Sequence, residues 1–174
     1  MRFLVTGSTG FIGSHLCRAL LETGHSVRAF HRPTSSLDLI KDLDVEHTIG
    51  DITQPKTLSD ALVEVDVVFH AASKVDYWRG QNEMYPVTVG GTRNVLQAAL
   101  EAGVQRIIYT SSVAALGVPV QNSLTPINEF HTWNYRPDWW RYGHALRWHS
   151  DVVHRDGQGP CPPSSEKRGP GLPS

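Results

Sequence analysis

The sequence predicts an α/β fold in which a parallel sheet is covered by helices on both faces. Short apolar runs of strand length alternate along the chain with segments whose apolar residues recur at helical spacing. The runs are almost continuously apolar, which is typical of strands that are buried on both faces. Parallel strands joined by right-handed crossovers place their helices on both sides of the sheet. The expected architecture is therefore a three-layer, doubly wound α/β domain.

Five runs are expected to form the strands of this sheet. They are 2–5, 26–30, 45–49, 66–69 and 106–109. Between them, apolar residues at helical spacing predict three helices. These residues include Ile12, Leu16 and Leu20, then Leu58 and Leu62, then Val95 and Ala99. Segment 31–44 carries Pro33 and a Thr-Ser-Ser run, so we expect a loop there with at most a short helix.

Length and composition favour one soluble domain that acts on small molecules. The chain has 174 residues, 40% of them hydrophobic, and a net charge of -1, so nothing indicates a nucleic-acid partner. The apolar run at the N-terminus ends after three residues, which predicts neither a signal peptide nor a membrane span and favours the cytoplasm. Cys17 and Cys161 offer neither a disulfide framework nor a metal-binding spacing, and we expect no metal.

A glycine-rich loop connects the first predicted strand to the first helix. Gly7, Gly10 and Gly13 follow one another at three-residue spacing in "VTGSTGFIGSHL". The first glycine permits a tight turn, the second lets the backbone approach a pyrophosphate, and the third allows close packing of helix and strand. The helix N-terminus offers free N–H groups to the phosphates. The context predicts a Rossmann-type dinucleotide site, with a glycine-rich turn that binds no ligand as the alternative.

Several further motifs occur in a fixed order along the chain. They are "GDI" at 50–52, "HAAS" at 70–73, "GTRNVLQAA" at 91–99 and "YTSSVAALG" at 109–117. Together with the TGxxGxxG spacing, they make residues 1–142 resemble the extended short-chain dehydrogenase/reductase family. Within it, the chain looks most like the dihydroflavonol reductase-like and 3β-hydroxysteroid dehydrogenase-like proteins. The resemblance implies that Phe11 and Ile12 join the three glycines in binding the cofactor.

The resemblance also assigns residues at the ends of the third and fourth strands. It implies that Asp51 and Ile52 flank the adenine of the cofactor, and that Ala71 and Ala72 border its nicotinamide half. From the residues alone, Asp51 can equally be a solvated loop carboxylate. Thr88 departs from the family pattern, which usually has Asn there, so we expect a helix hydrogen-bonding group to be lost near the active site.

The choice between NAD and NADP depends on the end of the second strand. A carboxylate there accepts hydrogen bonds from the adenosine ribose of NAD, whereas a cation favours the 2′-phosphate of NADP. The strand ends in Phe30, His31 and Arg32, and it has no carboxylate. Arg32 fits a phosphate clamp, with a solvated surface arginine as the alternative. We therefore expect NADP as the cofactor in preference to NAD.

The resemblance implies a catalytic Ser, Tyr and Lys, the Lys four residues after the Tyr. An ammonium beside a tyrosine favours the phenolate and so tunes it as a general acid or base. Ser112 matches the family serine, with Ser111 as the weaker choice, and Tyr142 matches the tyrosine. Position 146 should be Lys, but it is Leu146.

Other cations near Tyr142 do not replace this lysine. Arg147 is rotated off the Tyr142 face of a helix, and His144 lies on the opposite side. The recurring tail histidines, His144, His149 and His154, have no supporting carboxylates that would indicate a metal site. We therefore expect the chain to be inactive or very weakly active.

The alternation of apolar runs and helical patterns stops at about Tyr142. We assign 1–142 to the dinucleotide-binding domain, with 113–140 as a long active-site loop. Half of the residues beyond Ser150 are Gly, Pro or Ser, so 143–174 is expected to be a disordered tail in place of the family's substrate domain. The abrupt loss of family features favours a reading-frame change near 144–146, which translation of the other two frames of the gene would test.

The resulting functional hypothesis is an NAD(P)-binding protein similar to a reductase or dehydrogenase. In the family it resembles, such a protein transfers hydride between a nicotinamide cofactor and a secondary alcohol or ketone. Nucleotide-sugar epimerisation or dehydration is one alternative, and a dinucleotide-binding module without catalysis is another. The expected partners are the dinucleotide and a small-molecule substrate, with no nucleic acid and no membrane.

Overall fold

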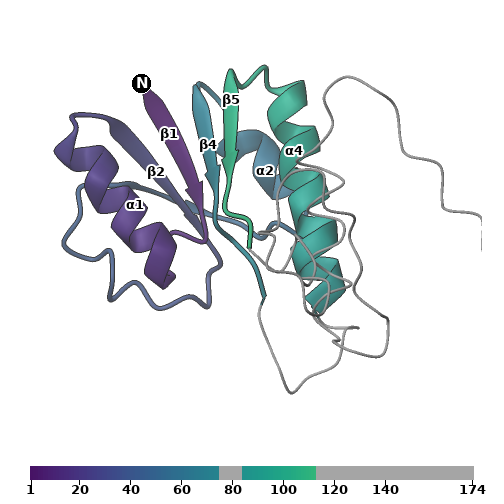
Figure 1. Ribbon diagram of the computed structural model, residues 1–174, viewed down its shortest axis with the longest axis horizontal. Coiled ribbons are helices and arrows are strands. Elements are labelled where there is room, and N and C mark those ends of the chain that lie inside the picture. The colour runs from purple at the N-terminus through teal and green to yellow at the C-terminus, as the bar shows by residue number, and fades with distance from the viewer. Residues whose placement is uncertain (75–83, 113–174) are drawn as a thin grey trace, which may run out of the picture.

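The computed structural model of the chain describes residues 1–74 and 84–112 (Figure 1). These residues contain every predicted strand and helix of the sheet domain. The expected loop at 113–140, the predicted catalytic residue Tyr142 and the expected tail at 143–174 lie outside them.

Strands and helices alternate as the apolar pattern predicts. In chain order the elements are β1 (Arg2–Thr6), α1 (Phe11–Glu22), β2 (Ser26–His31), β3 (Glu46–Ile49), α2 (Lys56–Ala61), β4 (Val67–His70), η1 (Pro86–Gly91), α4 (Thr92–Glu101) and β5 (Arg106–Tyr109). Each strand begins and ends within one residue of its predicted bounds. The segment between β2 and β3 contains no helix, so the predicted loop is confirmed.

The strands form one parallel sheet in the order β3-β2-β1-β4-β5. The chain runs outward from β1 to β3, and then crosses back to add β4 and β5 on the other side of β1. The strand order therefore reverses at β1, between β2 and β4. In open α/β sheets, ligands bind at the carboxyl ends of the strands beside such a reversal. The doubly wound Rossmann-type fold is thus confirmed, and it indicates where a ligand would bind.

The two faces of the sheet are covered by different helices (Figure 1). On one face, buried Leu4, Phe30 and Val68 pack with the apolar residues of α2 and α4. On the other face, Val5 and Val27 pack against Cys17 of α1. Successive strand residues thus alternate between the two cores, which explains why the strands read as continuous apolar runs.

Arg28 is the exception inside the apolar second strand. Its guanidinium is buried and donates hydrogen bonds to the carbonyl oxygens of Ala61 (2.7 Å) and Val63 (2.9 Å). It also forms a 2.9 Å ion pair with Glu46 of the neighbouring strand. This arginine therefore ties the end of α2 to the outer strands and satisfies carbonyls that a helix end leaves without intrahelical partners.

One element was not predicted from the sequence. Residues Pro86–Gly91 form a π-helix that continues directly into α4, where only an α-helix was expected. Pro86 is the first residue of η1, and the two residues before it, Met84 and Tyr85, are already helical, so the π-helix lies within a continuous helical segment. Short π-helical segments occur frequently at functional sites. This one places Thr88 against the segment that follows β4.

None of the helices in the described ranges combines the length and the apolar content needed to cross a membrane. Within the same ranges, no group of three or more His, Cys, Asp or Glu side chains is arranged to hold a metal ion.

Candidate functional site

The glycine loop between β1 and α1 has a conformation that glycine alone supports. Gly7 has a φ of +68°, in the left-handed region that favours glycine, and its carbonyl accepts a 2.9 Å hydrogen bond from the Gly10 N–H. A Cβ atom on Gly13 would lie 2.1 Å from the Gly7 oxygen. Helix α1 therefore packs on the turn itself, and a side chain at Gly13 would separate them.

Gly7 also allows the end of β4 to approach the loop. A Cβ atom on Gly7 would lie 2.8 Å from the backbone nitrogen of Ala72. On the other side, the buried Ser8 hydroxyl donates a 3.1 Å hydrogen bond to the carbonyl of Phe30 at the end of β2. The loop is therefore fixed between β2 and β4, at the reversal of strand order.

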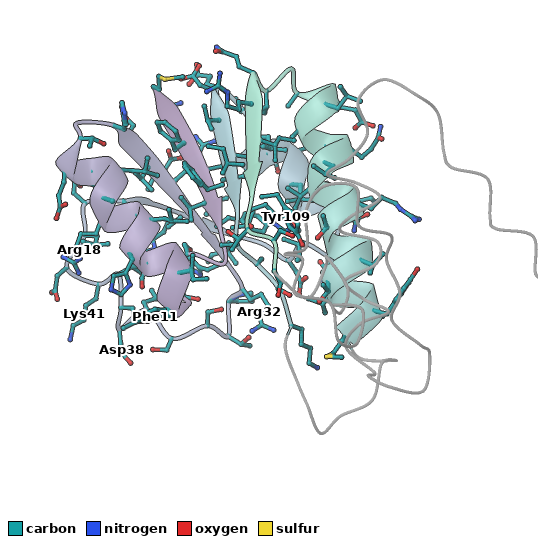
Figure 2. All side chains as sticks on the ribbon, in the orientation of Figure 1. Phe11, Arg18, Arg32, Asp38, Lys41 and Tyr109 are labelled. Carbon is teal, nitrogen blue, oxygen red and sulfur yellow. The ribbon has the colours of Figure 1, made fainter. Side chains whose placement is uncertain are left out.

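The loop leads into the N-terminus of α1, which begins at Phe11. The first N–H groups of a helix have no intrahelical partner, so those of Phe11, Ile12 and Gly13 are available to an anion. The side chain of Phe11 is 76% exposed and lies at the end of α1 (Figure 2). Phe11 and Ile12 therefore offer backbone N–H groups, and their side chains are not part of the sheet core.

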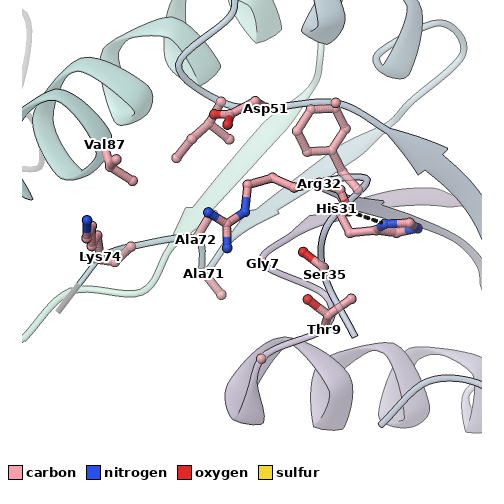
Figure 3. Close-up of a pocket in the computed structure, with 15 residues that line it drawn as sticks. Gly7, Thr9, His31, Arg32, Ser35, Asp51, Ala71, Ala72, Lys74 and Val87 are labelled. Atoms are coloured by element: carbon pink, nitrogen blue, oxygen red, sulfur yellow. Dashed lines mark hydrogen bonds between the residues drawn. The ribbon is translucent and has the colours of Figure 1, made fainter. Parts of the chain in front are cut away.

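A cavity of about 390 Å³ opens beside the glycine loop, at the carboxyl ends of the strands (Figure 3). It is lined by Gly7, Thr9, Gly10, Phe30, His31, Arg32, Ser35, Gly50, Asp51, Ile52, Ala71, Ala72, Ser73, Lys74 and Val87. Its volume is in the range of small-molecule and cofactor sites.

The cavity brings together most of the residues predicted to bind the cofactor. Those in its lining are Gly7, Gly10, Arg32, Asp51, Ile52, Ala71 and Ala72. Phe11, Ile12 and Gly13 are the first residues of α1 and are not part of the lining. The sequence interpretation did not assign the other eight lining residues to the site, which are Thr9, Phe30, His31, Ser35, Gly50, Ser73, Lys74 and Val87. Thr9 was the easiest to find, because it lies between the glycines of the motif.

Asp51 lines the cavity and also accepts hydrogen bonds within its own loop. Its Oδ1 atom accepts hydrogen bonds from the Thr53 backbone N–H (2.8 Å) and the Thr53 hydroxyl (2.7 Å). Thr57 closes the same loop, because its hydroxyl accepts a bond from the Asp51 N–H and lies within donating distance of the carbonyls of Gln54 (2.8 Å) and Asp51 (3.0 Å). The carboxylate therefore shapes the loop that follows β3, whether or not a ligand is bound.

A buried histidine connects three elements behind the cavity. His70 is fully buried at the end of β4, with Nδ1 2.7 Å from the Thr6 hydroxyl and Nε2 2.9 Å from the Thr92 hydroxyl. The Thr92 hydroxyl donates its proton to the Thr88 carbonyl at 2.6 Å, so His70 Nε2 must be the donor to Thr92. In the neutral ring, Nδ1 then accepts a hydrogen bond from Thr6.

A further hydrogen bond extends this series to Ala72, which lines the cavity. The Ala72 N–H donates to the Thr6 hydroxyl at 3.3 Å. The bonds thus run in one sense from Ala72 through Thr6, His70 and Thr92 to Thr88, with each hydroxyl both accepting and donating. These hydrogen bonds connect the backbone that follows β4 and borders the cavity to η1 and α4.

The expected loss of a hydrogen-bonding group at Thr88 is wrong. Thr88 is 1% exposed, and its hydroxyl lies 3.3 Å from the Ser73 hydroxyl, the Lys74 N–H and the Lys74 carbonyl. The shorter side chain still bonds the segment after β4, because the π-helix brings this position close to it.

The predicted catalytic serine follows the edge strand. Ser112 is half-buried three residues after the end of β5, and Ser111 beside it is exposed. The carboxyl end of β5 lies on the same side of the sheet as the cavity, because all five strands are parallel. Tyr142 and Leu146 lie outside the described residues, so the geometry of the predicted Ser-Tyr pair is not on view.

Comparisons with known proteins agree with the fold and identify the family. The model of the 3-beta hydroxysteroid dehydrogenase/isomerase family matches residues 4–140. A putative dihydroflavonol 4-reductase of Synechocystis is 42% identical over 117 residues, which are 67% of this chain and 34% of that protein. Sterol demethylase protein B of Methylococcus capsulatus is 41% identical over 124 residues, 71% of this chain and 38% of the relative.

A solved structure extends the likeness to three dimensions. A short-chain dehydrogenase/reductase superfamily protein from Agrobacterium tumefaciens, with bound NAD, has a TM-score of 0.72 at 30% identity and covers 88% of this chain and 44% of its own. The chain thus spans little more than a third of the length of the curated relatives named above. With the glycine loop, the strand order and the family match in agreement, the chain belongs to the 3-beta hydroxysteroid dehydrogenase/isomerase family of extended short-chain dehydrogenases/reductases.

Proposed function

We propose that the chain binds a nicotinamide dinucleotide in the cavity beside the glycine loop. The observation that carries this proposal is the cavity's position, between the N-terminus of α1 and the ends of β2 and β4. The residues fit the group, because Gly7 and Gly13 let the end of β4 and the helix α1 pack closely on the loop, which brings the N-terminus of α1 to the edge of the cavity. The N–H groups of Phe11, Ile12 and Gly13 would hold the pyrophosphate. When bound, the nicotinamide supplies or accepts hydride.

We further propose that NADP is preferred to NAD. Arg32 extends from the end of β2 into the cavity, while the hydroxyls of Thr9 and Ser35 lie near each other at one end (Figure 3). Asp51 lies at the opposite end (Figure 3), and its Oδ1 is already bonded to Thr53. The carboxylate of Asp51 lies at the other end of the cavity (Figure 3), so the guanidinium of Arg32 and the two hydroxyls suit a phosphate dianion better than a ribose diol.

The reaction we propose for enzymes that share this domain is hydride transfer to a ketone or from a secondary alcohol. Ser112 would hold the substrate oxygen and Tyr142 would exchange a proton with it. Support comes from the position of Ser112 after β5 and from the family, whose relatives include a putative reductase. With Leu146 where the family has Lys, the tyrosine lacks the neighbouring charge that favours its phenolate, so we expect little turnover from this chain.

The proposal is tested by titrating the full chain with NADPH and with NADH, following the nicotinamide fluorescence. We expect both to bind, and NADPH to bind more tightly. Arg32→Ala should weaken NADPH binding about tenfold or more and leave NADH binding unchanged, because it removes a charged hydrogen bond to the 2′-phosphate alone. Arg18→Ala is the matched control, since Arg18 lies on the exposed side of α1 away from Arg32 (Figure 2).

Two results would contradict the proposal in different ways. A chain that binds neither nucleotide rules out the cofactor site. A chain that reduces a panel of ketones with NADPH at rates usual for enzymes, about 1–1000 per second, rules out the weak turnover expected from Leu146.

A further inference from the structure

Two histidines on neighbouring strands meet beside the proposed phosphate site. His31 is the last residue of β2 and is 8% exposed, whereas His47 lies on the outer strand β3 and is exposed. The strand register pairs His31 with Ile49 and Ala29 with His47, so both histidines point to the same face of the sheet. Their rings meet edge to face, with centroids 5.3 Å apart and an angle of 76°.

The partners of the two rings fix the direction of their hydrogen bonds. His31 Nδ1 lies 3.1 Å from the carbonyl oxygen of Arg32, and a carbonyl can only accept, so Nδ1 carries the hydrogen. In the neutral ring, His31 Nε2 is then an acceptor. His47 Nδ1, 3.2 Å away, is therefore the donor. The bonds run from His47 through His31 to the backbone of Arg32.

The carbonyl of Arg32 also accepts the hydrogen bond that closes a β-turn. It receives a 3.1 Å hydrogen bond from the Ser35 backbone N–H, which closes a four-residue turn with Pro33 at its second position. Proline favours that position because its φ is already fixed there. Proline also restricts the backbone of the residue before it, which is Arg32. One oxygen atom thus holds both the buried ring and the turn.

This turn carries two of the side chains proposed to bind the 2′-phosphate. Arg32 starts the turn and Ser35 ends it, and both line the cavity (Figure 3). The His31 ring holds the shared carbonyl from the sheet side, and His47 fixes the plane of that ring. A displaced turn would move the guanidinium and the hydroxyl together, whereas the N-terminus of α1, which would hold the pyrophosphate, packs on the Gly7 backbone.

We propose that His47, acting through His31, is a positioning residue that determines the preference for NADP over NAD. The pair holds the turn of Arg32–Ser35 in the geometry that receives the 2′-phosphate before the cofactor arrives. Preorganisation of this kind adds affinity because the ligand need not order the loop. The inference rests on the proposed function, since it presupposes that this cavity binds the cofactor.

The experiment compares two substitutions at His47 in the full chain. His47→Phe keeps a planar ring but removes the donor, whereas His47→Asn keeps an N–H donor near the position of Nδ1. We expect His47→Phe to weaken NADPH binding about five- to tenfold, the value of one hydrogen bond, with NADH binding unchanged. His47→Asn should recover most of the affinity. His25→Phe, before β2 at the other end of the strand, is the matched control.

A double-mutant cycle distinguishes positioning from a general loss of structure. If His47 acts through the turn, His47→Phe should have no further effect on NADPH binding in a chain that already carries Arg32→Ala. Equal weakening of NADPH and NADH would overturn the inference, and so would an unchanged preference in His47→Phe. Failure of the unmodified chain to bind either nucleotide would instead reject the proposed function, and the inference with it.

Discussion

Substitution of Gly13 by alanine tests whether the packing of α1 on the glycine loop forms the cofactor site. The added Cβ atom would lie 2.1 Å from the Gly7 oxygen, 2.7 Å from the Gly7 carbonyl carbon and 2.8 Å from the Ser8 Cα. All three are backbone atoms, so no side chain can rotate away. Ordinary contacts are about 3.5 Å long, so the helix and the loop must separate by more than about 1 Å.

That displacement sets the size of the expected effect. Overpacking of this kind costs up to about 3 kcal/mol of unfolding free energy. A misplacement of about 1 Å at a binding site can cost about a hundredfold in function. For Gly13→Ala we therefore expect NADPH binding at least a hundredfold weaker, together with a lower urea midpoint of unfolding.

The assay is nicotinamide fluorescence titration, with urea unfolding followed by circular dichroism on the same samples. Gly10→Ala provides a graded comparison for stability, because its Cβ atom would lie 3.3 Å from the Gly7 oxygen and should lower the urea midpoint less. Gly90→Ala is the control, since its Cβ atom would meet no atom of the described residues within 4 Å. If Gly13→Ala binds NADPH as tightly as Gly90→Ala and unfolds at the same urea concentration, the reasoning is refuted.

Three further predictions concern buried polar groups. Arg28→Met should lower the unfolding free energy by about 3 kcal/mol in urea titrations, because two helix-end carbonyls lose their donor, while Arg18→Met on the exposed side of α1 should change little. His70→Leu leaves two buried hydroxyls without their ring partner and should cost about 2–3 kcal/mol in the same assay, and an unchanged midpoint would contradict this. Burial raises the pKa of the Cys17 thiol from 9.0 to about 11. The contribution of the protonated thiol to the unfolding free energy is therefore fully present below pH 9.0 and is lost as the pH rises through about 11. In a chain with Cys161→Ser, a thiol reagent at pH 8 should accordingly label Cys17 at the rate of unfolding, and fast labelling of the folded chain would refute the burial.

The fold could be predicted because its signals are local. The inner strands β1, β2 and β4 are short, mostly apolar runs, and they are buried because α1 packs on one face of the sheet and α2 and α4 on the other. The edge strands β3 and β5 remain largely exposed. The glycine motif also carries its own explanation, since Gly7 and Gly13 meet within the same turn. The assignment of Arg32 to the cavity follows from its place at a strand end, which a parallel sheet brings to one edge. The assignment of Asp51 came from the family resemblance, since the residues alone left open a solvated loop carboxylate.

The rest depended on contacts between distant segments. Nothing in "HRPTS" indicates that His31 bonds a histidine sixteen residues later, because the β2–β3 register decides that pairing. The π-helix was missed because the apolar residues that predicted a helix here, Val95 and Ala99, lie beyond Pro86–Gly91. The Thr88 contacts with the segment after β4 exist only once both segments are in place. Arg28 interrupts an apolar strand, and its carbonyl partners cannot be identified before α2 is positioned.

The one-directional bonding through His70 has a spectroscopic consequence. A neutral imidazole with hydrogen on Nε2 alone gives two well-separated ¹⁵N resonances, whereas a ring that exchanges tautomers gives averaged ones. Because Thr6 and Thr92 hold this ring between the cavity wall and the helix, its two nitrogen signals report whether that wall is assembled. One ¹⁵N-labelled buried side chain thus reports by NMR whether the cavity wall is folded, without a measurement of turnover and without a bound ligand.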